Sequence, residues 1–201
     1  MFKSRVLPLL LIITITIIFT AAYTHACVGR KLILGSIEAD RTGMVNRIIS
    51  ILINERTGTT VEVKFFPNRS KLHAAVKKHK VNLYVDYVER AIDRLKIEVS
   101  STDEKERFKT VKRQFEEELN LIWLKPMGYS GIDPDGQALG PASIVVQKKT
   151  LKKFPALPRL LQKIGTKVML DDERLDSLVS KTGSEKPAKV ARNFLKEVKL
   201  I

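Results

Sequence analysis

The chain has 201 residues, of which 44% are hydrophobic, 29% charged and 6% aromatic. This composition supports a globular core and excludes both a disordered chain and a polytopic membrane protein. Its 36 lysines and arginines exceed its 22 aspartates and glutamates, and the net charge of +14 favours nucleic acid or an anionic membrane surface as a partner. A single cysteine excludes an internal disulfide and any zinc site with two or more thiolates.

The first 26 residues are typical of a secretory signal peptide. Lys3 and Arg5 precede an apolar run over residues 6–22, and Thr24 and Ala26 supply small residues at the positions that an A-x-A cleavage site uses. The alternative is an uncleaved anchor, because about 17 apolar residues approach the minimum for a bilayer span. Export in either form argues against nucleic acid as a partner, and cleavage lowers the net charge from +14 to +12.

Cys27 directly follows the predicted cleavage site. A cysteine at this place in an exported bacterial chain resembles a lipobox, in which the thiol is acylated and becomes the new amino terminus. Thr24 and His25 differ from the usual lipobox residues. Cys27 is therefore either a lipidation site or an incidental thiol at the end of the mature chain.

The first half of the mature chain alternates strand-like and helix-like segments. Short apolar runs predict strands over residues 31–37, 60–66 and 81–88. Apolar residues at helical spacing predict helices over residues 41–56 and 71–80. Short connections between such segments are typical of βαβ units, which build a parallel sheet.

A binding site is expected where these strands end. Ligands of open parallel sheets bind beyond the carboxyl ends of the strands. The segments that follow the three strands are therefore expected to lie together at one edge: residues 36–40, 68–70 and 86–90.

The second half contains more helix than strand. Strands are predicted over residues 121–124 and 142–147, and between them residues 126–141 form a turn-rich loop with four glycines. Helices are predicted over residues 101–119, 148–164, 171–181 and 187–198.

The sequence contains no nucleophile elbow, no H-E-x-x-H motif, no P-loop and no G-x-G-x-x-G motif. His73 and His79 lie six residues apart on one predicted helix, so they face different sides and cannot share a metal ion. We therefore expect neither catalysis nor a bound metal or cofactor.

Two tyrosines in the third predicted strand are the strongest candidates for ligand contact. Tyr84 and Tyr87 are three residues apart, so they point to opposite faces of a regular strand. A tyrosine ring attracts a quaternary ammonium group, which cannot donate hydrogen bonds. The alternative is that both rings only pack beneath neighbouring helices.

Further segments occur in a recognisable order. They are Leu34-Gly35-Ser36, residues 82–87 (Asn-Leu-Tyr-Val-Asp-Tyr), residues 123–129 (Trp-Leu-Lys-Pro-Met-Gly-Tyr), and residues 142–146, 154–157 and 190–195. Together they resemble the periplasmic substrate-binding proteins of the glycine betaine/carnitine/choline type, which serve ABC importers. The resemblance implies an α/β, parallel-sheet, periplasmic-binding-protein-like single lobe with flanking helices, over residues 27–201.

Several departures from the family pattern affect the expected site. Asn82 replaces an aspartate, Ile37 follows the first Gly-Ser, and residues 88–90 (Val-Glu-Arg) replace Thr-Gly-Thr. The largest departure is that residues 130–140 stand where family members have a whole second lobe. Since that lobe supplies the far wall of the ligand clamp, we expect weakened or lost binding.

The site residues implied by the resemblance fall into groups. Tyr84 is the expected aromatic wall, with Tyr87 and Tyr129 as further walls. Polar contacts to a carboxylate or hydroxyl are expected from Ser36, Asn68, Ser70 and Asn82, and Arg41 or Thr42 would add positive potential at a helix start.

Two functions therefore remain open. The first is an exported solute-binding domain that takes a quaternary amine and serves an ABC permease. The second is a non-catalytic envelope protein that kept the fold and binds anionic membrane or cell-wall surfaces through paired lysines. Both place the chain in the periplasm or on the cell membrane by a lipid anchor.

Overall fold

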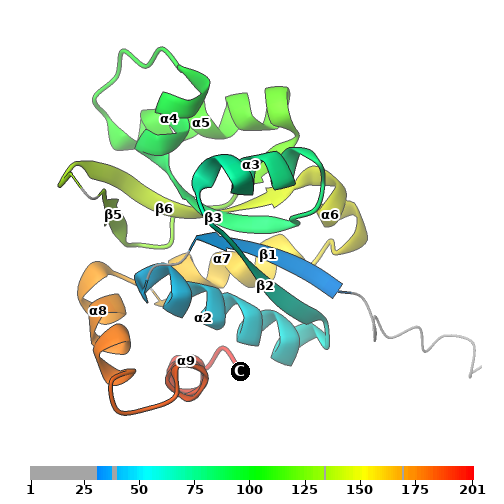
Figure 1. Ribbon diagram of the computed structural model, residues 1–201, viewed down its shortest axis with the longest axis vertical. Helices are drawn as coiled ribbons and strands as arrows, with labels where there is room; N and C mark the ends of the chain where they lie inside the picture. The colour runs from blue at the N-terminus through cyan, green and yellow to red at the C-terminus, as the bar shows by residue number, and fades with distance from the viewer. Residues whose placement is uncertain (1–30, 38–39, 134, 169) are drawn as a thin grey trace, which may run out of the picture.

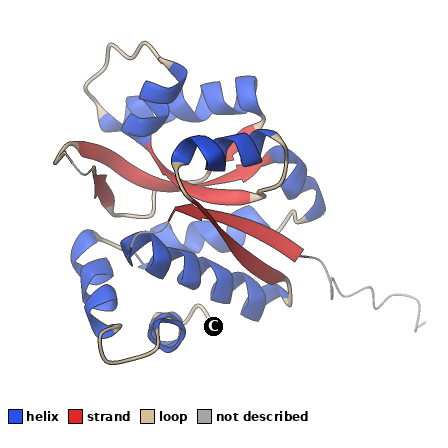
Figure 2. Cartoon of the chain, viewed as in Figure 1, coloured by secondary structure: helices blue, strands red, loops and turns tan. Residues whose placement is uncertain are grey.

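The computed structural model describes residues 31–37, 40–133, 135–168 and 170–201. The predicted signal peptide and Cys27 lie outside the described residues. Within them, a six-stranded sheet lies between two groups of helices (Figures 1 and 2). None of the described helices is long and apolar enough to cross a bilayer.

The first half of the chain confirms the predicted alternation. Its elements are β1 (Lys31–Ile37), α2 (Asp40–Thr57), β2 (Thr60–Phe66), α3 (Arg69–Lys77) and β3 (Leu83–Tyr87). Helix α3 begins two residues before the predicted start because Asn68 caps it: the Asn68 Oδ1 accepts a hydrogen bond from the Lys71 amide at 3.0 Å.

Helix α4 (Val88–Leu95) follows β3 without a loop, which the sequence analysis did not predict. It ends at Lys96, whose left-handed backbone (φ 52°) stops the helix. After it come α5 (Glu104–Leu119) and β4 (Leu121–Trp123), where a helix and a strand are predicted.

The predicted glycine-rich loop is wrong in part, because it contains a hairpin. Strand β5 (Ser130–Ile132) pairs with the start of β6 (Ala138–Gln147), which begins four residues before the prediction. The predicted helix over residues 148–164 is interrupted at Phe154-Pro155 and forms α6 (Lys148–Lys153) and α7 (Leu157–Lys163). The remaining elements are the π-helical segment η1 (Ile164–Val168), α8 (Asp172–Lys181) and α9 (Pro187–Glu197).

The sheet order β2-β1-β3-β6-β4 places the ends of the strands. Strand β1 pairs in parallel with β2 and β3, whereas β6 runs antiparallel to both β3 and β4. Four strands of the main sheet therefore run in one direction. Their carboxyl ends meet at one edge, which we call the carboxyl edge, and the end of β6 lies at the opposite edge.

The sheet divides the apolar core into two parts. Helices α2, α7, α8 and α9 cover one face, and helices α3, α4 and α5 cover the other (Figure 1). Strand β3 contributes to both: Leu83, Val85 and Tyr87 belong to the first cluster, and Tyr84 belongs to the second. The predicted separation of the two tyrosines onto opposite faces is confirmed.

Candidate functional site

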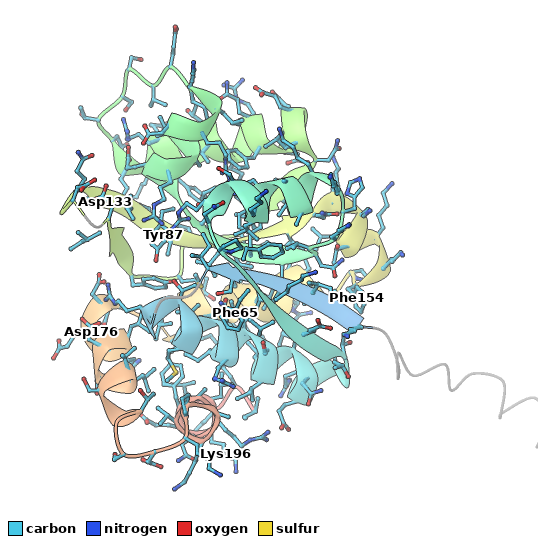
Figure 3. All side chains as sticks on the ribbon, viewed as in Figure 1. Phe65, Tyr87, Asp133, Phe154, Asp176 and Lys196 are labelled. Atoms are coloured by element: carbon cyan, nitrogen blue, oxygen red, sulfur yellow. The ribbon has the colours of Figure 1, made fainter. Side chains whose placement is uncertain are left out.

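The carboxyl edge brings together residues from separate parts of the chain. Ser36 lies near the end of β1, Tyr87 ends β3, Arg41 lies in the first turn of α2, and Tyr129 immediately precedes β5. Figure 3 shows Tyr87 on the side of the sheet where the β5–β6 hairpin lies. Three predicted site residues, Ser36, Tyr87 and Tyr129, thus lie at the same edge of the sheet. Arg41, which was predicted to add positive potential to the site, lies there as well.

Tyr87 and Tyr129 form the aromatic part of this site. Their ring centroids are 6.3 Å apart and the rings are nearly perpendicular, at 83°. Both side chains are buried, and burial raises the pKa of each hydroxyl. The pair is therefore a rigid, neutral aromatic contact over the physiological pH range.

A glycine makes room for this ring pair. A Cβ on Gly131 would lie 2.5 Å from the Tyr87 ring, so no side chain fits without moving the ring. We expect Gly131→Ala to lower the free energy of unfolding by about 1–3 kcal/mol in urea denaturation. Gly43, inside α2, has nothing within 4 Å of its Cβ position. Gly43→Ala is the matched control and should stabilise the protein; equal effects of the two changes would contradict the prediction.

Both tyrosine rings already have a cation beside them. The Arg90 Cζ lies 5.1 Å from the centroid of the Tyr87 ring, and the Arg41 Cζ lies 6.0 Å from the centroid of the Tyr129 ring. These distances are within the range of a cation–π interaction. The arginines of the chain thus already make the cation–π contacts with these rings that a quaternary ammonium ligand would need.

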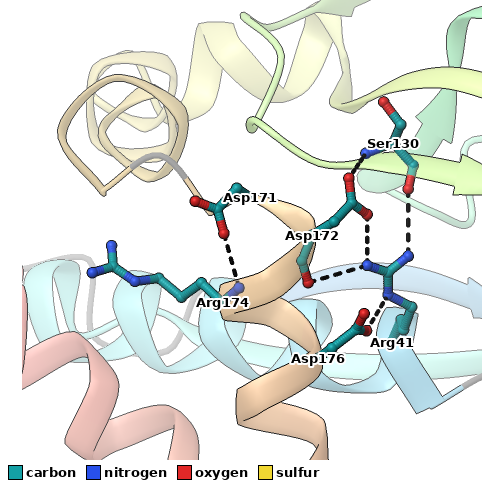
Figure 4. A network of polar contacts seen from close by, with 6 residues as sticks. All are labelled: Arg41, Ser130, Asp171, Asp172, Arg174 and Asp176. Atoms are coloured by element: carbon teal, nitrogen blue, oxygen red, sulfur yellow. Dashed lines mark hydrogen bonds and ion pairs between the residues drawn. The ribbon is translucent and has the colours of Figure 1, made fainter.

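Ion pairs hold Arg41 in this position (Figure 4). Its guanidinium donates to the Asp172 carboxylate at 2.6 Å and lies 2.9 Å from an Asp176 oxygen. The second Asp172 oxygen accepts a hydrogen bond from the Ser130 amide at 3.2 Å, and the Arg41 guanidinium also reaches the Ser130 carbonyl at 3.5 Å. This network joins the start of α2, the hairpin and the start of α8, so moving Arg41 off the ring disrupts several contacts.

Ser36 and Asn46 form a buried polar pair at the end of β1. The Asn46 amide donates to the Ser36 Oγ at 2.6 Å, and both residues are almost completely buried. The Asn46 Oδ1 has no hydrogen-bond partner among the described residues. Ser36 thus contacts a neighbouring helix directly, and its hydroxyl is already used within the protein.

Tyr84 lies on the other face of the sheet, away from Tyr87 and Tyr129. Its ring packs edge-on against His73 of α3, with 5.7 Å between centroids. On the same face, the buried Asp86 carboxylate accepts a hydrogen bond from Arg94 at 2.7 Å. Tyr84 therefore cannot form one aromatic box with the other two tyrosines.

Of the remaining predicted polar residues, only Asn82 lies at the opposite edge of the sheet. The Asn82 amide accepts from the Ile33 backbone at 2.7 Å and donates to Thr150 at 3.2 Å, so it joins β1, β3 and α6 at the opposite edge. Asn68 and Ser70 follow the carboxyl end of β2 and so lie at the carboxyl edge, as predicted; Asn68 caps α3, and Ser70 is exposed in the first turn of that helix. Thr42 is half-buried in the first turn of α2.

The sequence analysis missed the groups that complete the carboxyl edge: Asn46, Arg90, Asp172 and Asp176. Arg90 alone had a usable signal, because it lies within the segment expected to follow the third strand. The ion pair between Arg41 and Asp172 joins residues 131 positions apart in the sequence, so no local sequence pattern predicts it.

Solved structures of other proteins share the fold of this chain at low sequence identity. No protein-family model matches the chain. A solved structure of a glycine betaine/carnitine/choline ABC transporter protein matches at a TM-score of 0.74 and 12% identity, covering 85% of this chain and 98% of that one. Apo YehZ from Escherichia coli matches at a TM-score of 0.72 and 13% identity, covering 85% of this chain and 99% of that one.

A third structure, lactococcal OpuAC in a closed form with glycine betaine, matches at a TM-score of 0.53 and 10% identity over 85% of this chain and 96% of that one. Identities this low establish the fold and leave the ligand open. Together with the mostly parallel sheet and its two helical layers, these matches identify the described residues as a single lobe with the fold of the glycine betaine/carnitine/choline-type substrate-binding proteins of ABC transporters.

Proposed function

We propose that this chain is an exported, non-catalytic, solute-binding-protein-like domain of an ABC importer whose own affinity for quaternary amines is weak or lost. The fold supports the first part, because its structural neighbours are substrate-binding proteins. Residues 1–26 would direct export and residues 27–201 would form the domain, with a permease of the importer as its partner.

The arginines beside Tyr87 and Tyr129 are the observation that carries the second part. A quaternary ammonium group binds by placing its charge on an aromatic face, and it gains nothing where another cation already lies. Arg41 is further held by two carboxylates, so displacing it removes the ion pairs that it makes with Asp172 and Asp176. The site is thus better suited to stabilising its own helices than to receiving a cationic ligand.

The short β5–β6 hairpin leaves the site without a second wall. Substrate-binding clefts bury most of the ligand, and closure of one lobe on another provides the burial. On an open edge, two cation–π contacts contribute about 1–2 kcal/mol, whereas millimolar affinity needs about 4 kcal/mol.

A thermal-shift screen with glycine betaine, choline, carnitine and ectoine tests the proposal. We expect no shift in melting temperature at ligand concentrations below the millimolar range. The reasons are that arginines already lie beside both tyrosine rings and that no second wall would enclose the ligand. Should a shift occur, Tyr87→Ala and Tyr84→Ala separate the two faces of the sheet. Low-micromolar calorimetric affinity in a chain shown to be monomeric by light scattering would refute the proposed loss of binding.

A second candidate is an envelope interaction protein that binds anionic surfaces. The exposed lysines of α6, Lys148, Lys149 and Lys152, favour it. Binding to anionic vesicles that weakens as salt rises would support this function, since exposed charges are screened within about 8–10 Å at physiological ionic strength.

A further inference from the structure

A pocket lies on the face of the sheet opposite the tyrosine pair. It is enclosed by α3, α4, the end of α5 and α6, and its volume is about 600 Å³. Cavities of this size hold small organic molecules. The lining does not include Arg41, Tyr87 or Tyr129, so a ligand here does not contact the tyrosine pair; Tyr84, the aromatic wall expected from the sequence, does line the pocket.

Two residues that line the pocket, Tyr84 and Arg94, each have a buried polar atom without a hydrogen-bond partner of ordinary geometry among the described residues. Tyr84 is 1% exposed, and its hydroxyl makes no hydrogen bond of ordinary geometry with any described residue, although the Arg94 guanidinium is close by. The Arg94 Nε likewise has no acceptor in the described part of the chain. A buried polar group without a partner is costly, so both atoms favour an acceptor from outside the chain.

The rim of the pocket is basic. Lys77 comes from the end of α3, and Lys149 and Lys152 come from α6. All three are exposed, and no carboxylate of the described residues pairs with them. Lys148 also lines the pocket but is paired with Glu116 at 3.1 Å. The one acidic lining residue among those described is Glu118.

The two histidines of the lining have partners within the protein. The His79 Nδ1 lies 2.9 Å from the Gln147 Oε1, and the His73 ring is in contact with Arg94. Val76, Leu95 and Leu119 supply apolar walls. The pocket therefore has hydrogen-bond donors without acceptors, unpaired lysines at its rim, and apolar walls that could contact the apolar part of a ligand.

We propose that this pocket binds a phosphate group carried on a small apolar body. The dianion of a phosphomonoester and the monoanion of a phosphodiester headgroup both present only acceptor oxygens on phosphorus, which match the Tyr84 hydroxyl and the Arg94 Nε, and Lys149 and Lys152 balance their negative charge. The apolar walls and the volume select an organic phosphoester over inorganic phosphate. A soluble phosphomonoester and an anionic lipid headgroup share this chemistry.

Calorimetry of the purified chain with phenyl phosphate, and flotation with phosphatidylcholine vesicles with and without phosphatidylglycerol, test the proposal and separate the two sources. Saturable binding of phenyl phosphate assigns the pocket to soluble phosphoesters. Binding to phosphatidylglycerol vesicles alone assigns it to a lipid headgroup. In either case Lys149→Ala/Lys152→Ala should weaken binding about tenfold.

Two controls keep this test specific. Lys189→Ala/Lys196→Ala removes the same charge from α9, on the other side of the sheet, and should leave affinity within about twofold. Tyr84→Phe removes only the side-chain hydroxyl, so affinity should fall severalfold without a loss of melting temperature. The proposal is overturned if neither probe binds, if the two lysine pairs weaken binding equally, or if Tyr84→Phe binds as tightly as the wild type.

Discussion

Asp86→Asn is expected to lower the free energy of unfolding by about 3–5 kcal/mol at neutral pH. The Asp86 carboxylate is 1% exposed and accepts a hydrogen bond from Arg94 at 2.7 Å, and the Arg69 guanidinium lies 3.7 Å away. A neutral amide cannot balance these two positive charges. The variant therefore leaves two partly buried guanidinium groups without a counter-charge, which costs more than the lost contact itself.

Urea denaturation followed by circular dichroism measures this effect. Glu116→Gln is the matched control, because it removes a carboxylate from an exposed ion pair with Lys148. Exposed pairs contribute little, so the control should unfold close to the wild type. If Asp86→Asn lowered the free energy of unfolding by less than about 1 kcal/mol, the result would contradict the view that this carboxylate neutralises the charges of Arg69 and Arg94.

The same carboxylate gives the stability a predictable dependence on pH. Burial on its own would raise the pKa of Asp86, but the His73 ring, 3.7 Å from the carboxylate, and the hydrogen-bonded Arg94 guanidinium outweigh it and hold the pKa below the ordinary value of 3.8. The unfolded chain then binds this proton at a higher pH than the folded chain. The contribution of Asp86 is therefore complete above pH 3.8 and is lost as the pH falls through the lowered pKa.

Comparing the wild type with Asp86→Asn across the acid range isolates this contribution. The difference in unfolding free energy should be constant above the ordinary carboxyl pKa and should shrink below it, because the protonated wild type comes to resemble the variant. A difference that persists unchanged into strong acid would mean that Asp86 acts through its shape and hydrogen bonds instead of its charge.

The elements that could be predicted from sequence are those with uninterrupted local patterns. Strands β1 and β2 have the predicted bounds, and α2 differs by a single residue at each end, since its apolar spacing is regular and Gly58 ends it with a left-handed backbone (φ 66°). The opposite orientations of Tyr84 and Tyr87 also follow from local geometry, because side chains alternate along any strand.

The hairpin and the site depend on contacts that local patterns do not encode. The start of β6 contains Gly140 and Pro141, residues typical of a turn, and is a strand because it pairs with β5. Arg41 is one of 36 basic residues, and only the folded chain brings it to the Tyr129 ring. The resemblance found the correct fold, but it could not show that the two aromatic faces are already occupied.

Gln147→Ala is expected to destabilise the protein by about 2–4 kcal/mol, the second largest effect we expect from one side chain. Gln147 ends β6 and is 3% exposed. Its amide donates to the Val76 carbonyl at 2.8 Å and to the Val81 carbonyl at 2.7 Å, so it ties the end of α3 to the sheet. Alanine leaves both buried carbonyls without a donor and opens a cavity where the amide was.

Gln137→Ala controls for the loss of an exposed glutamine, because the hydrogen bond from Gln137 to Asp133 uses its backbone amide, which alanine retains. This variant should unfold like the wild type. Since Gln147 also lines the basic pocket and positions α3, its loss should weaken phenyl phosphate binding in parallel with stability. Unchanged stability would show that α3 is held to the sheet by its apolar contacts alone, and the amide would then have no structural role at this edge.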